Sequence, residues 1–319
     1  MSRRAGASPS PSMSSVESTS ARLREVSPAR YAQLAAASAL SLYLIVLTGA
    51  LVRLTGSGLA CESWPGCQEG AFFPAEAGHA SVEFGNRVMA LFPIVLTLAA
   101  WIFARRTQGL SRWSTWLAAF TFLGTIAQAP LGLLTIRLDL HPLMVLTHFL
   151  LALVVLAGAV VLAVEAWGNA RGRVPSPVPN WLRLVGLVLA VACGILVVTG
   201  TLSTAAGPHP GDSADIDRFW NLLDAVWLHV RATAAFGIAF LLLLGWLVRE
   251  RARARGLLYG AAVLLGLLLV QMAVGEIQFR NQLPAWLVLI HVALAAAVWA
   301  WTIGLVAALW RTPRPLVRL

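Results

Sequence analysis

Eight long apolar stretches constrain the fold of this chain more than any other feature of its sequence. An α-helix rises about 1.5 Å per residue, so about 20 mostly apolar residues are needed to cross a bilayer. Charged residues make up only 12% of the chain, about half the usual share in a soluble domain. The sequence therefore predicts an all-α integral membrane protein. Its spans are expected at 31–52, 81–104, 113–135, 142–164, 181–202, 223–248, 257–278 and 284–310.

The arginines predict how these spans are oriented. All 24 basic residues are Arg, and 18 of them lie on the side that carries both termini. The other side carries the remaining six, which are Arg53, Arg87, Arg137, Arg218, Arg231 and Arg280. Cytoplasmic loops are enriched in Arg and Lys, so we expect a multi-pass protein of the cell (plasma) membrane with both termini in the cytoplasm. The net charge of +10 is spread over these loops, which argues against a nucleic-acid-binding face.

An internal repeat divides the chain into two halves. Four residues of the third and fourth spans recur 143 positions later in the seventh and eighth spans. The pairs are Gln128 and Gln271, Gly132 and Gly275, Arg137 and Arg280, and His148 and His291. Thr48-Gly49 and Thr199-Gly200 form a weaker echo. Both halves begin on the same side, so we expect two pseudo-symmetric four-helix bundles related by an axis along the membrane normal.

The repeat and the composition together predict five segments. These are a disordered cytoplasmic tail (1–30), a first half (31–165), a cytoplasmic linker (166–180), a second half (181–310) and a second cytoplasmic tail (311–319). The first tail is rich in Ser, Pro and Arg and has too few apolar residues to pack. The apolar stretch that follows is too long for a signal peptide and lacks a cleavage pattern, so we expect an uncleaved first span.

Three histidines and one asparagine are expected at a common depth in the membrane. His148 and His291 are repeat partners, and the same offset places Asn86 at the position of His229. Each lies about six or seven residues inside the outer end of an even-numbered span, roughly 10 Å deep. A histidine in hydrocarbon is costly, so it marks either a functional site or a hydrogen bond between helices.

Haem binding explains three such histidines better than helix association does. Neutral imidazole is an axial ligand of haem iron, and helix bundles hold cofactors between facing helices. We therefore expect a fixed haem b between His229 and His291. The first half offers His148 opposite Asn86, which is a poor iron ligand, and this suits a haem that is itself being changed.

Charged residues are expected around these positions. Glu83 lies three residues before Asn86 on the same helix face, where a carboxylate could manage protons in an oxidation. The alternative is an ion pair with Arg87 at i,i+4, and the two roles can hold together. Haem propionates need cations near the outer surface, and the candidates are Arg87, Arg137, Arg231 and Arg280. For Arg137 and Arg280, snorkelling to the membrane interface is the alternative.

Two cysteines lie six residues apart in the first large outer loop. An oxidising outer face favours a disulfide between Cys61 and Cys67, whereas two free thiols or a metal-binding pair are the alternatives. Cys193 lies within a span, where we expect it to pack in the core.

Together these residues resemble the haem A synthase family. The stretch from Thr48 to Cys61 and on to Cys67 resembles that family's first outer loop and its cysteine pair. Glu83-Phe84-Gly85-Asn86-Arg87 resembles its Glu-x-x-His-Arg motif, with Asn86 at the histidine position, as in a bacterial, actinobacterial-like variant. His148, His229 and His291 match its remaining histidines. The resemblance covers about residues 35–310.

The resemblance implies an oxidoreductase that converts the C8 methyl of haem O to a formyl group, with water as the oxygen source. The product, haem A, would serve a terminal oxidase. It implies haem b on His229 and His291, haem O near His148, and Glu83 as catalytic acid/base or cation stabiliser. It also implies a Cys61–Cys67 disulfide over the substrate half. Haem O synthase (protohaem farnesyltransferase) and cytochrome c oxidase assembly are the implied partners, beside the lipid bilayer.

Two other functions compete with this interpretation. A haem b-containing electron-transfer protein, such as a quinone oxidoreductase, would leave haem unmodified. It would need two permanent pairs of histidine ligands, and Asn86 argues against the first pair. A transporter is the other alternative, because duplicated bundles are common among transporters. The polar residues of this chain cluster near one face and leave the membrane midplane apolar, which disfavours a transporter.

Overall fold

The computed structural model describes residues 25–75, 77–212 and 218–317, and within them the chain is helical. The α-helices are α2 (Pro28–Leu54), α3 (His79–Met89), α4 (Leu91–Ala104), α5 (Arg112–Arg137), α6 (Pro142–Arg171), α7 (Asn180–Ala206), α8 (Leu222–Arg249), α9 (Arg255–Arg280) and α10 (Ala285–Trp310). A 3-10 helix, η1 (Arg314–Leu316), follows. Since α3 and α4 form one span, these residues make eight segments long and apolar enough to cross a membrane. The predicted all-α membrane fold is confirmed.

Helix boundaries extend beyond the apolar stretches. α2 begins at Pro28, so the last three residues of the predicted 1–30 tail are helical. The Ser27 side chain accepts a hydrogen bond from the backbone N–H of Arg30, and proline suits the first helical position. The prediction of disorder for 1–24, and the last two residues of the 311–319 tail, lie outside the described residues.

The extension of α6 to Arg171, beyond the predicted end at 164, carries Glu165, a buried carboxylate with two more exposed arginine partners. The carboxylate of Glu165 is 2.7 Å from Arg173 and 3.3 Å from Arg311. These partners come from the connection after α6 and from the end of α10. Because the charge is paired, the helix can carry Glu165 in a buried position, and the cluster ties the two halves together.

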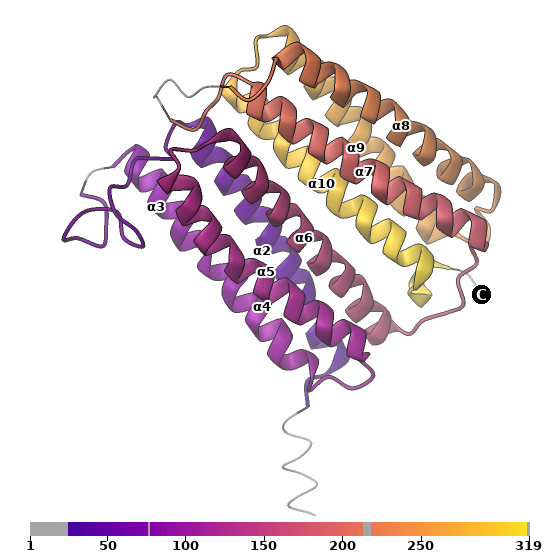
Figure 1. Cartoon of the computed structure of the whole chain (residues 1–319). Helices are drawn as coiled ribbons and strands as arrows, with labels where there is room; N and C mark the ends of the chain where they lie inside the picture. The colour runs from indigo at the N-terminus through magenta and orange to yellow at the C-terminus, as the bar shows by residue number, and fades with distance from the viewer. Residues whose placement is uncertain (1–24, 76, 213–217, 318–319) are drawn as a thin grey trace, which may run out of the picture.

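The second span is interrupted between α3 and α4 at Ala90. Pro93 has no backbone N–H, so it cannot bond to the carbonyl of Met89 four residues earlier. The short helix α3 ends at Met89, the residue whose carbonyl Pro93 leaves without this bond, and it carries Glu83 and Asn86 on a segment separate from α4. Figure 1 places α3 at the same end of the bundle as the first large loop.

The two predicted halves are two groups of helices that lie side by side. Figure 1 shows α2 to α6 in one group and α7 to α10 in the other. α10 packs on α2 and α6, and α6 also contacts α7. Hydrogen bonds cross between the groups from Tyr43 Oη to the Ala293 carbonyl (3.1 Å) and from Trp299 Nε1 to the Leu153 carbonyl (2.8 Å). Cys193 is fully buried in the core of the second group, as expected.

The internal repeat extends to the backbone of the turns. Asp139 and Leu140, between α5 and α6, both have positive φ (48° and 55°). Gln282 and Leu283, 143 positions later between α9 and α10, have φ of 62° and 58°. Two consecutive residues other than glycine in this region are uncommon. The same unusual turn therefore occurs at corresponding places in both halves, at the end of the bundle that carries Cys61 and Cys67. We call this the disulfide end.

Candidate functional site

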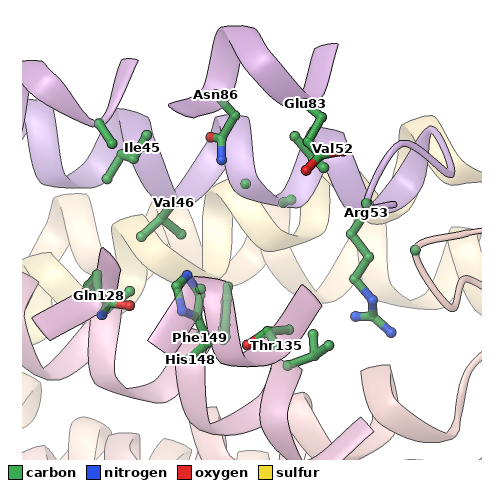
Figure 2. A pocket seen from close by; sticks show the side chains of 18 of the residues that line it. Ile45, Val46, Val52, Arg53, Glu83, Asn86, Gln128, Thr135, His148 and Phe149 are labelled. Atoms are coloured by element: carbon green, nitrogen blue, oxygen red, sulfur yellow. The ribbon is translucent and has the colours of Figure 1, made fainter. Parts of the chain in front are cut away.

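A cavity of about 540 Å³ lies at the disulfide end, mostly within the first half and partly lined by α7, α10 and the loop after α7. This volume falls within the range of pockets that enclose organic ligands, about 300–1,000 Å³. Most of the lining is apolar. The charged and strongly polar side chains that line it are Arg53, Glu83, Asn86, Arg87, Gln128, His148 and Arg218. Figure 2 shows Asn86, from α3, and His148, from α6, on opposite sides of this space.

Asn86 and His148 both line the cavity but differ in their hydrogen bonding. Thr48 Oγ1 donates a hydrogen bond to Asn86 Oδ1 (2.7 Å), which fixes the asparagine side chain. His148 Nδ1 is buried, and no described residue gives it a hydrogen-bond partner. Both amide atoms of Gln128 are also buried without a partner in the described part of the chain. Unpaired buried polar atoms are costly, so the cavity offers groups that a polar ligand would satisfy.

The second half repeats this arrangement with histidine in place of asparagine. Thr199 Oγ1 lies 3.2 Å from His229 Nδ1, as Thr48 contacts Asn86 in the first half. The rings of His229 and His291 pack on glycines of neighbouring helices. A Cβ at Gly200 would lie 3.0 Å from His229 Cε1, and a Cβ at Gly275 would lie 3.0 Å from His291 Cε1. The repeated residues Thr199, Gly200 and Gly275 therefore contact the imidazole rings of His229 and His291 and hold them in position.

The His229 and His291 rings lie edge to face, with centroids 6.4 Å apart and planes at 68° to each other. A metal–imidazole bond is about 2 Å long, so two rings on opposite sides of one metal ion have centroids roughly 6 Å apart. No group of three or more His, Cys, Asp or Glu side chains placed to hold a metal occurs among the residues described. Two histidines suffice where a porphyrin supplies the other ligands, and His291 Nε2 also lies 3.1 Å from the Gln271 amide nitrogen. The pair fits an axially ligated haem.

Glu83 and Arg87 hold the loop that the disulfide closes. Cys61 and Cys67 are joined by a disulfide. Glu83 Oε2 accepts a hydrogen bond from the backbone N–H of Cys61 (2.8 Å), and Glu83 Oε1 lies 2.5 Å from Arg87 Nη2. The predicted Glu83–Arg87 ion pair is therefore present.

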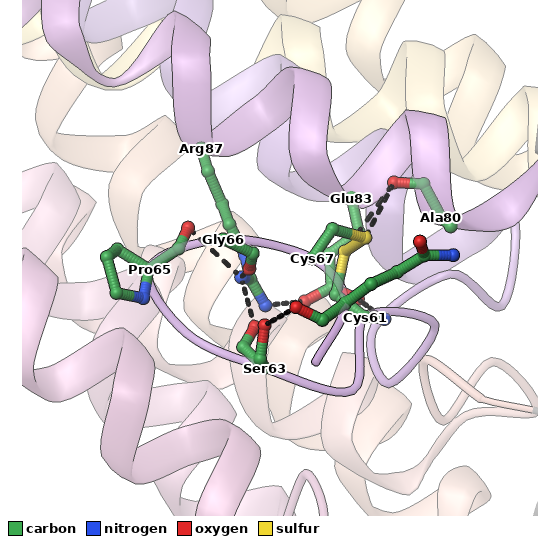
Figure 3. Close-up of polar contacts among 9 residues, drawn as sticks. Cys61, Ser63, Pro65, Gly66, Cys67, Ala80, Glu83 and Arg87 are labelled. Atoms are coloured by element: carbon green, nitrogen blue, oxygen red, sulfur yellow. Dashed lines mark hydrogen bonds and ion pairs between the residues drawn. A yellow bond between two sulfur atoms is a disulfide. The ribbon is translucent and has the colours of Figure 1, made fainter. Parts of the chain in front are cut away.

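Arg87 reaches further into this loop, as Figure 3 shows. Its Nη1 donates to the carbonyl oxygens of Ser63 (2.7 Å) and Gly66. The Glu83 side chain is 5% exposed, and it lines the cavity as well. The pair therefore joins the disulfide loop to the wall of the cavity.

The second large loop crosses from the second half to the first. His209 Nε2 lies 2.8 Å from the carbonyl oxygen of Leu283, in the turn between α9 and α10. Two residues later, the carbonyl of Gly211 accepts a hydrogen bond from the backbone N–H of Gly58 (2.8 Å). Pro210 and Gly211 line the cavity. The loop therefore covers the cavity at the disulfide end.

One of the four arginines predicted to bind propionates lies at this cavity. Arg87 lines the cavity, whereas Arg137, Arg231 and Arg280 are exposed and are not part of its lining. Arg280 forms an ion pair with Glu276 instead.

Three lining residues were not predicted as site residues. In the sequence, Arg53 and Arg218 stand out only as arginines on the outer side of the membrane, and Gln128 only as part of the internal repeat. The signal for Arg53 was its position at the outer end of the first span, beside the cavity-forming helix α3. For Arg218 the chain offers no comparable signal, because a loop brings it to the cavity.

The similarity of this chain to known proteins extends over both halves. A sequence model of the COX15-CtaA family, described as cytochrome oxidase assembly protein, matches residues 32–303. The chain is 28% identical over 270 residues to a heme A synthase of Symbiobacterium thermophilum, covering 80% of this chain and 88% of that protein. It is 26% identical over 272 residues to a heme A synthase of Listeria monocytogenes, covering 81% and 88%. A shorter match, 32% identical over 124 residues, is to a heme A synthase of Bacillus licheniformis, covering 39% and 41%.

Proposed function

This chain belongs to the COX15-CtaA family of cytochrome oxidase assembly proteins, and from this premise we propose that it is a haem A synthase. In this function it oxidises the C8 methyl of haem O to a formyl group and so provides haem A for a terminal oxidase. The observation that carries the proposal is the cavity between Asn86 and His148. Its size and its position among membrane spans suit a large, apolar, iron-containing substrate.

Haem O occupies the first half as the substrate. His148 is the one imidazole that lines the cavity among the described residues, and Asn86 faces it from the opposite wall. His148 is the protein ligand that this cavity offers to the substrate iron. Asn86 is held by Thr48 and leaves the other side of the iron without a strong ligand.

Haem b occupies the second half, held by His229 and His291. The 6.4 Å separation of their ring centroids supports this assignment. Bound there, haem b supplies a carrier that accepts electrons one at a time. The glycines beneath both rings hold them in place for this role.

Glu83 is the residue we assign to proton transfer. Each oxidation of the methyl group removes an electron pair and releases protons, while water supplies the oxygen. Glu83 lines the cavity as a buried carboxylate, and both its oxygens accept hydrogen bonds, from Cys61 N–H and from Arg87. It is therefore a fixed negative group that can accept a proton or stabilise a positive charge on the substrate.

The membrane arrangement follows from the same proposal. The disulfide end faces outward and both termini lie in the cytoplasm of a cell whose plasma membrane holds the protein. The segment boundaries at 31–165 and 181–310 then separate the substrate half from the haem b half. Haem O synthase is the partner that would deliver the substrate.

Co-expression with a haem O-producing farnesyltransferase tests the function directly. Haems are extracted from membranes with and without this chain and identified by chromatography and mass spectrometry. We expect haem A, or its hydroxylated precursor, only when the chain is present. Haem b alone on the purified chain would instead support an electron-transfer protein, and a chain without haem would support a transporter.

A further inference from the structure

The charges around the cavity are unbalanced. Its lining contains three arginines, Arg53, Arg87 and Arg218, but Glu83 is the one acidic side chain among the described lining residues. Glu83 is paired with Arg87 at 2.5 Å. Arg53 therefore adds a positive charge that no acidic side chain of the described lining pairs with, and Arg218, which has contacts of its own, lines the same cavity. A cavity that is largely apolar elsewhere makes such charge costly unless a ligand brings negative charge.

Arg53 is directed toward the cavity from the last turn of α2. Its Nη2 donates a hydrogen bond to the carbonyl oxygen of Thr204, at the end of α7 (2.6 Å). Its Nε is buried and has no hydrogen-bond partner among the described residues. Guanidinium groups bind carboxylates through paired N–H groups, and the Nε–H of Arg53 is still without an acceptor among the described residues.

The position of Arg53 gives the cavity two chemically different ends. Figure 2 shows Arg53 on the same side as Glu83 and away from Gln128. The loop that carries Gly211 covers this side, since a Cβ at Gly211 would lie 3.6 Å from Arg53 Cγ. Apolar residues from α2, α4 and α6 line other parts of the space; these include Leu42, Ile45, Val46, Ile94 and Val155.

Haem O has a matching asymmetry. Its two propionate carboxylates lie on one edge of the porphyrin ring, and its long isoprenoid chain lies on the opposite edge. The C8 methyl is next to one of the propionate-bearing carbons. A cation that binds the propionates therefore also fixes where the reacting methyl lies.

We propose that Arg53, together with Arg218, forms the carboxylate-binding site for the propionates of haem O. This rests on the proposed function and adds the orientation of the substrate. The isoprenoid chain then points to the apolar part of the cavity, and the C8 methyl lies on the Glu83 side. Arg53 comes from the first half and its Thr204 partner from the second, so the site is complete only where the two halves meet.

Binding of haem and of haem dimethyl ester by the full-length, purified protein tests the site without turnover. The ester keeps the ring but removes both carboxylate charges. The probes are iron protoporphyrin IX and its dimethyl ester, titrated into wild-type protein whose second-half site is already loaded, and haem O is titrated in parallel. We expect the wild type to bind the free acid at least about 10-fold more tightly than the ester, as charge-assisted hydrogen bonds imply.

Substitution of Arg53 tests whether this residue causes the preference for the free acid over the ester. Arg53→Gln should weaken binding of the free acid about 10-fold or more and leave binding of the ester within about 2-fold. Arg53→Lys should recover part of the loss, because the charge remains while the paired N–H groups do not. Arg112→Gln makes the same chemical change at the exposed start of α5, and both affinities should stay as in the wild type.

Three results would overturn the proposal. They are equal wild-type affinities for the two probes, equal weakening of both by Arg53→Gln, and unchanged binding of the free acid by that variant. If Arg53→Gln does not fold, the wild-type comparison of the two probes and Arg218→Gln still decide the matter. Failure of the proposed function looks different: the carboxylate preference would be present, yet no haem A would form from bound haem O.

Discussion

Alanine in place of Gly275 tests whether the His291 ring is held where a haem iron needs it. A Cβ at this position would lie 3.0 Å from Cε1 and 3.4 Å from Nδ1 of His291. Ordinary contacts of a Cβ begin at 3.4 Å, so the ring would have to move by roughly 0.4 Å. Since Gly275 lies on α9 and His291 on α10, the movement would carry the ring away from its seat.

A displacement of this size is large for a metal ligand. Metal–ligand distances in a working site hold within about 0.2 Å, and changes in residues that support a ligand lower metal affinity about 10- to 100-fold. We therefore expect Gly275→Ala to weaken haem b binding about 10-fold or more. The fold should survive, because alanine is more favourable than glycine in a helix by about 1 kcal/mol.

The assay measures haem content per chain, together with optical and electron paramagnetic resonance spectra of purified protein. Gly275→Ala should lose haem b and the low-spin signal of a bis-histidine site. Gly132→Ala is the matched control, because a Cβ there would lie 3.4 Å from His148 Cε1, an ordinary contact. The reasoning is refuted if Gly275→Ala keeps the wild-type haem content and spectrum, or if Gly132→Ala loses haem b equally.

Three further predictions follow from contacts described above. Asn86→His should convert the substrate haem to a six-coordinate, low-spin form, measured by electron paramagnetic resonance. The described residues leave room for the ring, since none lies within 4 Å of a Cβ at Gly49. Glu83→Gln should retain haem O binding yet lower haem A yield at least about 10-fold, measured by haem extraction; an unchanged yield would remove Glu83 from the mechanism. Glu165→Gln leaves its two arginines without an anion, so thermal unfolding should show a loss of about 1–3 kcal/mol of stability with the haem spectra unchanged.

The sequence predicts the membrane spans well because they depend on local chemistry. Length and apolarity decide whether a stretch crosses a membrane, and the offset of 143 residues places His148 and His291 at equivalent positions. The weaker echo of Thr48-Gly49 in Thr199-Gly200 corresponds to equivalent contacts, of Thr48 with Asn86 and of Thr199 with His229.

Features that depend on the meeting of distant segments escape sequence reasoning. A proline such as Pro93 weakens the helix that precedes it. The break at Ala90 was nevertheless not predicted, because the apolar stretch continues through it. Arg53 and Arg218 are far apart in the chain, and they meet at the cavity only because one loop folds across the other half. An exposed outer arginine and a cavity-lining one look alike until that loop is placed.

In the proposed function, one framework serves two haems with different fates. Thr48 and Thr199 make equivalent contacts, with Asn86 and with His229, so the neighbouring helices hold these positions alike. The space differs: a Cβ at Gly200 would press on the His229 ring at 3.0 Å, whereas no described atom lies within 4 Å of one at Gly49. A tightly seated imidazole pair favours a permanent ligand set, and an open position beside Asn86 favours a haem that can enter, react and leave. In the proposed function, this difference in clearance distinguishes the substrate site beside Asn86 from the cofactor site at His229.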